Sequence, residues 1–185
     1  MLFRSNGDTE NDPVSSRYTS QWSIERYEGA DWYGGDLAGI EAKLDYISKE
    51  LGANVIYTNP TFSTYHNAGY GPIELTTINP IYGSNAEYAE LIARVHDRGL
   101  KIINDGVWLY THANSRYLNV NGFYPGEQGA LQSETSRYKD LLYWNSWPDD
   151  YVAIGFGPKV NYNTDTTRDR SEERRVGKEC RSRWS

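Results

Sequence analysis

The sequence predicts an α/β fold in which helices alternate with parallel strands. Two helical periodicities and two short β-rich runs support this prediction. A helical pattern over residues 36–51 precedes a strand pattern over 54–58, and a second helical pattern from Ser84 to Gly99 precedes a strand pattern over 100–105. Helix, strand, helix, strand is the repeating unit of a parallel sheet covered by helices.

The first helix is predicted by apolar residues that recur at spacings of three and four, which places them on one helical face. Gly52 supplies a stop signal after this pattern. The run 54–58 is short and β-rich, and Asn59-Pro60 closes it, as expected of a buried strand. The apolar face of the helix consists of Leu37, Ile40, Leu44, Ile47 and Leu51.

The second helix is predicted to begin at a capping box formed by Ser84 and Glu87. In such a box, each side chain accepts a hydrogen bond from the backbone amide of the other residue. Residues 100–105 that follow are largely apolar, which is typical of a strand covered on both faces.

Beyond Val107, about fifty residues show no sustained period and are dense in Tyr, Trp, Gly and Asn. Long irregular segments in compact domains are usually functional loops or small inserted domains. The rings of this segment either pack a small core or face a ligand. They include Tyr117, Phe123, Tyr124, Tyr138, Tyr143, Trp144, Trp147 and Tyr151.

The two ends differ in character from the interior. Residues 170–185 resemble the conceptual translation of a sequencing adapter and residues 1–5 resemble the opposite adapter, so both are set aside in fold reasoning. A basic arm for nucleic acid is the alternative reading of the tail. The formal net charge is −6 and becomes more negative without the basic tail, which argues against nucleic acid as a partner. No run of about 18 apolar residues predicts a membrane span.

Four motifs occur in an order that carries a family resemblance. They resemble successive segments of α-amylase-family glycoside hydrolases. The four motifs are residues 32–37 (WYGGDL), 54–60 (NVIYTNP), 101–107 (KIINDGV) and 158–161 (PKVN). The resemblance runs over nearly all of residues 6–169.

The resemblance implies a partial (β/α)8 TIM barrel that holds strands two and three with their helices. Residues 6–108 would form the N-terminal part of this barrel. Residues 109–160 would form an inserted, loop-rich segment similar to domain B, and residues 161–169 would return to the barrel. The nucleophile, the acid/base and a further aspartate come from strands four, five and seven in this family. We therefore expect no catalytic residue in the chain and no activity from it.

The implied function of the parent protein is hydrolysis or transglycosylation of α-glucans or maltooligosaccharides by the retaining, two-carboxylate mechanism. The alternative is an amylase-like glucan-binding or scaffold protein that has lost catalysis. Leu109 and Tyr110 motivate this alternative, because relatives have a histidine at the position of Tyr110 that hydrogen-bonds the sugar.

Three residues are expected to contact or support the substrate. Tyr70 stands where the family stacks an aromatic ring on the sugar being cleaved, a contact that suits the apolar face of a pyranose. An ordinary loop tyrosine is the alternative.

Asp105 ends a strand at the barrel edge where active sites form, and in the family it supports the nucleophile's strand. A buried structural aspartate is compatible with that role. Tyr110 could donate a hydrogen bond but carry no positive charge.

A calcium site is expected after strand one. Residues 6–12 (NGDTEND) gather oxygen ligands of the kind that calcium prefers, although an exposed polar loop is the alternative on this motif alone. In members similar to neopullulanases and cyclomaltodextrinases, such a loop binds calcium together with a downstream G-G-D. The residues that match those positions are Asn6, Asp8, Asn11, Asp12, Gly34 and Asp36.

Overall fold

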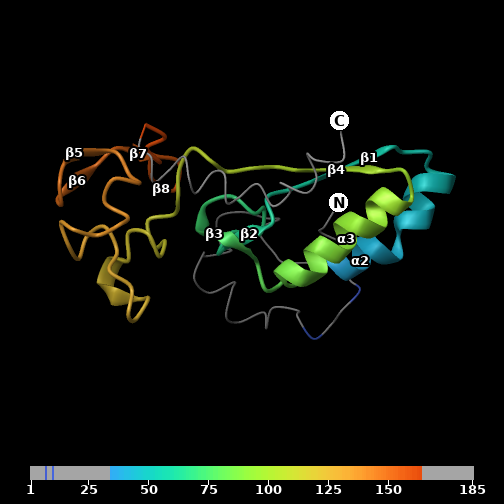
Figure 1. Ribbon diagram of the computed structural model, residues 1–185, viewed down its shortest axis with the longest axis horizontal. Coiled ribbons are helices and arrows are strands. Elements are labelled where there is room, and N and C mark those ends of the chain that lie inside the picture. The colour runs from blue at the N-terminus through green and yellow to red at the C-terminus, as the bar shows by residue number, and fades with distance from the viewer. Residues whose placement is uncertain (1–6, 8–9, 11–33, 164–185) are drawn as a thin grey trace, which may run out of the picture. The chain divides into compact units, whose positions relative to one another are not determined.

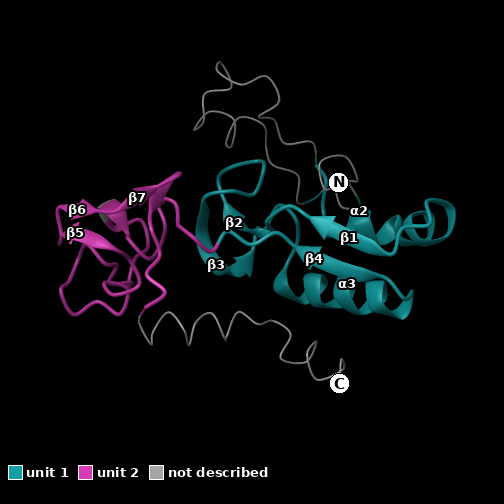
Figure 2. Ribbon diagram, turned by 90° about the horizontal axis from the view of Figure 1, so that it is seen from above, with its two compact units in different colours: residues 1–107 teal, residues 108–185 magenta. Residues whose placement is uncertain are grey.

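The computed structural model describes residues 7, 10 and 34–163 of the chain. The chain divides into two compact units, residues 1–107 and residues 108–185 (Figure 2). Within the described residues of the first unit lie α2 (Leu37–Ala42), a π-helix (Tyr46–Glu50), β1 (Val55–Thr58), β2 (Phe62–Thr64), β3 (Pro72–Ile78), α3 (Asn85–Asp97) and β4 (Lys101–Asn104) (Figure 1).

The predicted strands pair as a parallel sheet. Residues of β1 lie opposite residues of β4, from Val55 beside Lys101 to Thr58 beside Asn104. Helix α3 precedes β4 directly, so the described part of the first unit contains the strand, helix, strand order of an α/β fold. The predicted α/β class is therefore confirmed.

The first helical segment is not one continuous α-helix. Helix α2 stops at Ala42, because the amide of Lys43 bonds the carbonyl of Ile40 rather than that of Gly39. The chain then continues to the π-helix, where the amide of Leu51 bonds the carbonyl of Tyr46. Of the predicted apolar face, Leu37, Ile40, Leu44 and Ile47 are buried, whereas Leu51 at its end is 53% exposed.

Helix α3 begins at the predicted capping box. The side chain of Ser84 accepts the Glu87 amide at 3.2 Å, and the Glu87 carboxylate accepts the Ser84 amide at 2.6 Å. These hydrogen bonds with Ser84 lower the pKa of Glu87. Two ion pairs tie α3 and its C-cap to the preceding helical segment, Arg94 to Glu41 at 2.8 Å and Arg98 to Asp45 at 2.9 Å.

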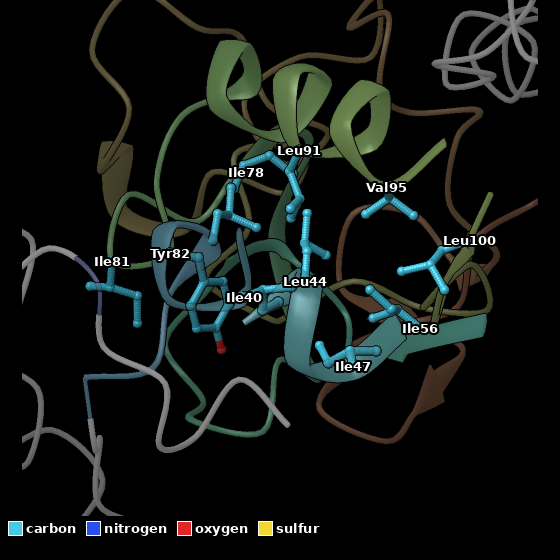
Figure 3. Close-up of a cluster of buried hydrophobic side chains, with 11 residues drawn as sticks. Ile40, Leu44, Ile47, Ile56, Ile78, Ile81, Tyr82, Leu91, Val95 and Leu100 are labelled. Atoms are coloured by element: carbon cyan, nitrogen blue, oxygen red, sulfur yellow. The ribbon is translucent and has the colours of Figure 1, made fainter. Parts of the chain in front are cut away.

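A hydrophobic core lies between the helices and one face of the parallel sheet. Figure 3 shows its side chains gathered beside α3 and the first helical segment. Its buried members are Leu37, Ile40, Leu44, Ile47, Ile56, Ile78, Ile81, Tyr82, Leu91, Val95 and Leu100. The opposite face of the β1–β4 pair is open, with Val55 38%, Tyr57 60% and Ile103 50% exposed. The expectation that the 100–105 strand is covered on both faces does not hold among the described residues.

The segment between β1 and α3 holds an antiparallel hairpin that the sequence did not predict. Strands β2 and β3 pair irregularly, with register shifts on both sides of Ser63. Such irregularities disturb the alternation of polar and apolar residues from which strands are recognised.

The second unit contains short ladders. It comprises a 3-10 helix (Val120–Gly122) and the strands β5 (Trp144–Ser146), β6 (Asp150–Tyr151), β7 (Ala153–Ile154) and β8 (Gly157–Pro158), with β5 paired to β6 and β7 to β8. Its core contains Tyr117, Leu118, Tyr138, Leu141, Leu142 and Val160, all nearly inaccessible to solvent. None of the helices in the described ranges is long and apolar enough to span a membrane.

Candidate functional site

The first unit brings Tyr70 and Asp105 together, although 35 residues separate them along the chain. The Tyr70 hydroxyl donates to Asp105 Oδ2 at 2.7 Å. This hydrogen bond anchors the phenol. Tyr70 nevertheless remains 38% exposed, so part of its surface is open to solvent. An aromatic ring held in this way is suited to stacking on a sugar.

The turn that carries Tyr70 is fastened to the ends of neighbouring strands. The Thr64 hydroxyl contacts the carbonyl oxygens of Tyr70 and Gly71 at 2.9 and 3.0 Å. The Asn59 side chain donates to the Ala68 carbonyl at 3.2 Å. Gly69 has a φ of 85° and its Cα lies against the Pro60 carbonyl, where a Cβ would overlap that oxygen. Glycine is therefore required for the turn to close beside β1.

Asp105 extends the parallel ladder by one residue. Its amide donates to the Thr58 carbonyl at 3.0 Å. Next to it, Asn104 Oδ1 accepts the Thr58 hydroxyl at 2.8 Å, which joins the C-terminal ends of β1 and β4. Because both strands are parallel, these polar groups gather at one edge of the sheet, and this is the edge at which α/β barrels form their active sites.

Tyr57 is a further member of this cluster that sequence reasoning missed. Desolvation raises the pKa of the Tyr57 phenol, and the negative charge of Asp105 and a hydrogen bond to its carboxylate add to the effect. The Asp105 carboxylate is thus approached by two phenols, from β1 and from the β2–β3 turn. The period-two spacing of Val55 and Tyr57 was the available signal, since it places both on one face of β1.

The predicted calcium ligands fall partly outside the described residues. The structure describes Gly34 and Asp36. The predicted ligands outside the described residues are Asn6, Asp8, Asn11 and Asp12. Asp36 is fully buried and caps α2, and its Oδ1 accepts the Gly39 amide at 2.6 Å.

Gly7, which stands between two of the predicted ligands, lies against this cap. Its amide donates to Asp36 Oδ1 at 2.9 Å. A Cβ on Gly7 would overlap the backbone of Ala38 and Gly39, so only glycine fits so close to the helix. No group of three His, Cys, Asp or Glu side chains suited to a metal occurs within residues 7, 10 and 34–163.

Tyr110 belongs to the second unit. It forms an isolated antiparallel β-bridge with Lys159. Its ring packs against Gly155, and the ring centroid lies 6.2 Å from that of Phe156. Burial raises the pKa of its phenol. His112 lies two residues further on and is itself buried, with its Nδ1 accepting the Asn114 amide at 3.0 Å.

The aromatic residues of the second unit divide into core and surface. Tyr117 and Tyr138 are buried and meet edge to face with their centroids 5.3 Å apart, so they pack the core. Phe123 and Phe156 are exposed, at 65% and 40%. Trp147 lies between these extremes, and the Lys139 ammonium sits 4.7 Å from its ring centroid.

The parallel strand pair and the helices that cover one face of it define an α/β protein. The chain belongs to the α-amylase family of glycoside hydrolases. The sequence model of that family described as the α-amylase catalytic domain matches residues 3–155. The resemblance drawn from the ordered motifs is thereby confirmed.

Individual relatives agree with this membership. The chain is 38% identical over 117 residues to an amylopullulanase of Thermoanaerobacterium saccharolyticum, which covers 63% of this chain and 9% of the relative. It is 32% identical over 157 residues to a cyclomaltodextrinase of Thermoanaerobacter pseudethanolicus, which covers 85% of this chain and 24% of the relative. The chain therefore spans at most about a quarter of the length of these relatives.

A solved structure supports the fold. The ligand-free cyclic α-maltosyl-(1→6)-maltose hydrolase of Arthrobacter globiformis superposes with a TM-score of 0.71 at 21% identity, covering 94% of this chain and 38% of that chain. At this identity the likeness establishes a partial barrel-like α/β fold.

Proposed function

We propose that the chain is the N-terminal part of the catalytic barrel of a hydrolase or transglycosylase that acts on α-glucans or maltooligosaccharides. Residues 6–108 supply the barrel part, 109–160 the inserted segment and 161–169 the return to the barrel. The family match supports this class of enzyme. The hydrogen bond between Tyr70 and Asp105 is the observation that carries the substrate assignment.

In this proposal the chain binds and orients the sugar. The ring of Tyr70 stacks on a pyranose, and its bond to Asp105 fixes the direction of the ring. Asp105 is a positioning residue. Separately from Tyr70, we propose that Tyr110 of the second unit offers a hydroxyl that can hydrogen-bond to a glucan, without the positive charge that a histidine can carry.

Bond cleavage by the retaining mechanism requires two carboxyl groups about 5–5.5 Å apart on either side of the glycosidic bond. We assign both groups to the parent protein outside these 185 residues. Purified chain is therefore expected to release no reducing sugar from starch, pullulan or cyclodextrin, while an active cyclomaltodextrinase does so in the same assay. Sugar release above the buffer level by the chain, persisting through repeated purification, contradicts this assignment.

The substrate assignment is tested by the binding of maltohexaose to the chain, measured by calorimetry. Tyr70→Ala is expected to weaken binding roughly two- to twelvefold, because an aromatic contact is worth about 0.5–1.5 kcal/mol. Tyr70→Phe keeps the ring and loses only the bond to Asp105, so its affinity should fall between wild type and Tyr70→Ala. Equal affinity of wild type and Tyr70→Ala rules out Tyr70 as a sugar platform.

The second candidate is a non-catalytic glucan-binding or scaffold protein with the same barrel. The observation that favours it is Tyr110, whose ring is packed on Gly155 at the position where relatives carry a histidine. Strand four of the longer gene discriminates the two candidates. A G-x-R-x-D segment supports the enzyme, and loss of its aspartate supports the scaffold.

We also propose the calcium site. The donor set fits a hard cation, because it consists of carboxylate, amide and backbone oxygens. The hydrogen bond from the Gly7 amide to Asp36 Oδ1 supports it, since it joins one residue of the 6–12 motif to the proposed ligand Asp36. The ion would connect the N-terminal loop to α2. The residues that would hold it are Asn6, Asp8, Asn11, Asp12, Gly34 and Asp36.

A further inference from the structure

Tyr57 lies on the open face of β1 and reaches the carboxylate of Asp105. The residue is 60% exposed, and its hydroxyl donates a hydrogen bond to Asp105. The Tyr70 hydroxyl donates to Oδ2 of the same carboxylate at 2.7 Å. We define Tyr57, Tyr70 and Asp105 as the Asp105 cluster.

The strand register brings Tyr57 to Asp105. Tyr57 lies opposite Ile103 in the parallel pair, and Asp105 comes two residues after Ile103. The Asp105 amide donates to the Thr58 carbonyl at 3.0 Å, so the ladder continues to this residue. Because side chains alternate along a strand, Tyr57 and Asp105 project from the same face. Their contact therefore follows from the pairing of β1 with β4.

Packing does not account for the tyrosine at position 57. The core of the first unit receives Ile56 from the other face of β1, and Ile56 is 4% exposed. Stabilisation by apolar packing scales with the area removed from water, and more than half of Tyr57 remains accessible. The contribution of Tyr57 is therefore its hydroxyl group, which is bound to Asp105.

A second donor restricts the Asp105 carboxylate. The terminal torsion of an aspartate side chain is broad, so a carboxylate that is held by one donor can still turn about that bond. An ionised carboxylate accepts several hydrogen bonds at once. In the Asp105 cluster, Tyr57 donates from β1 and Tyr70 donates from the turn between β2 and β3. Two donors from different elements fix the carboxylate plane, and with it the acceptor that anchors the Tyr70 ring.

The two phenols stand on elements of different rigidity. Tyr57 belongs to a strand whose backbone is paired with β4, whereas Tyr70 belongs to a turn. Groups on strands are held more precisely than groups on loops. The orientation is therefore transmitted from Tyr57 through Asp105 to Tyr70.

We propose that Tyr57 is a positioning residue, whose hydrogen bond to Asp105 holds the carboxylate in the orientation that directs the Tyr70 ring toward the sugar. This inference rests on the proposed function for its ligand. It adds to that function a residue that acts on the sugar only through Asp105 and Tyr70.

Fluorine NMR tests the positioning without any sugar. A 3-fluorotyrosine placed at position 70 alone gives one resonance, which reports the surroundings of that ring. Tyr57→Phe keeps the neighbouring ring and removes only its hydroxyl, so it is expected to shift this resonance. Asp105→Ala is expected to shift it as well, and Tyr57→Phe should add no further shift in the Asp105→Ala background.

Val55→Ala is the matched control for the fluorine measurement. Val55 lies on the same open face, two residues before Tyr57, and is 38% exposed. Its replacement should leave the resonance in place. The proposal is overturned if Tyr57→Phe does not move the resonance, or if it moves it equally with and without the Asp105 side chain.

Affinity for maltohexaose gives the second readout. Tyr57→Phe is expected to weaken binding roughly two- to fivefold, as for the indirect loss of one hydrogen bond. In the Asp105→Ala background the same substitution should have no further effect, because coupled residues are not additive. Additive losses in the double variant would show that Tyr57 acts independently of Asp105, and would overturn the proposal.

Unfolding in urea separates positioning from a structural role. The urea midpoint of Tyr57→Phe should equal that of wild type, because the ring is retained and the residue is exposed. A lower midpoint that accompanies the loss of affinity makes Tyr57 a structural residue and overturns the inference.

The inference and the proposed function fail in different ways. Weaker binding by Tyr70→Ala together with wild-type affinity in Tyr57→Phe overturns the inference and leaves the proposed function standing. Wild-type affinity in Tyr70→Ala overturns the sugar contact of the proposed function, while a resonance at position 70 that still responds to Tyr57→Phe supports the positioning of the ring.

Discussion

Replacing Leu91 by alanine is expected to lower the free energy of unfolding of the chain by about 2–5 kcal/mol. Leu91 is 1% exposed and packs from α3 into the core of the first unit (Figure 3). Truncation removes its buried methyl groups and leaves a cavity that the flanking helices can fill only in part. Urea unfolding followed by circular dichroism measures the change, and the slope with denaturant should stay the same.

Leu51→Ala is the matched control for this prediction. It removes the same atoms from the end of the first helical segment, but Leu51 is 53% exposed. Its effect should therefore stay within about 0.5 kcal/mol, as for most surface substitutions. If both alanine variants unfold at the same urea concentration, α3 does not pack as the structure has it.

Removing the Asp36 side chain is expected to be almost as costly. Asp36→Ala deletes the cap of α2, worth about 1 kcal/mol, and leaves the Gly7 amide without its acceptor, which costs about 1–3 kcal/mol if that amide remains buried. Together these losses should lower the free energy of unfolding by about 2–4 kcal/mol in chelator. Thermal or urea unfolding with EDTA present measures this effect without calcium.

Asp36→Asn separates the cap from the metal site. Asparagine retains an oxygen that can accept both amides, so its stability in EDTA should remain within about 1 kcal/mol of wild type. Calcium at a hundredfold excess over its Kd should stabilise the intact parent protein by about 2.7 kcal/mol and its asparagine variant by much less. The chain alone should lack most of this benefit, because a preformed metal site rarely exists without the complete fold. If the intact parent melts at the same temperature in calcium and in EDTA, the N-terminal loop is a polar turn and the calcium assignment fails.

Local sequence signals predicted the first unit well where the determining contacts lie close together in the chain. Ser84 and Glu87 are three residues apart, and their capping box forms as the pattern indicates. The apolar runs of β1 and β4 likewise predicted strands. Each run is apolar because one face of the strand is buried against the helices. Spacing alone could not predict the π-helix, since apolar residues at intervals of three and four fit both helix types over so short a segment.

The site depended on contacts that no local pattern contains. Tyr70 and Asp105 were named from the family resemblance, but their hydrogen bond spans 35 residues and requires the β2–β3 hairpin, which the sequence did not predict. Tyr57 was missed because its role depends on the register that places β1 beside β4.

The open face of the β1–β4 pair bears on how the chain behaves in concentrated solution. Its apolar side chains, Val55 and Ile103, lie on a sheet of only two described strands. An exposed apolar sheet surface of this kind promotes association between copies of the chain. Lys101 stands opposite Val55 and is exposed, so it places a positive charge at one end of this face. Charged residues of this kind oppose strand-to-strand stacking between molecules. Colloidal solubility of the chain should therefore depend on Lys101 and on the ionic strength that screens its charge.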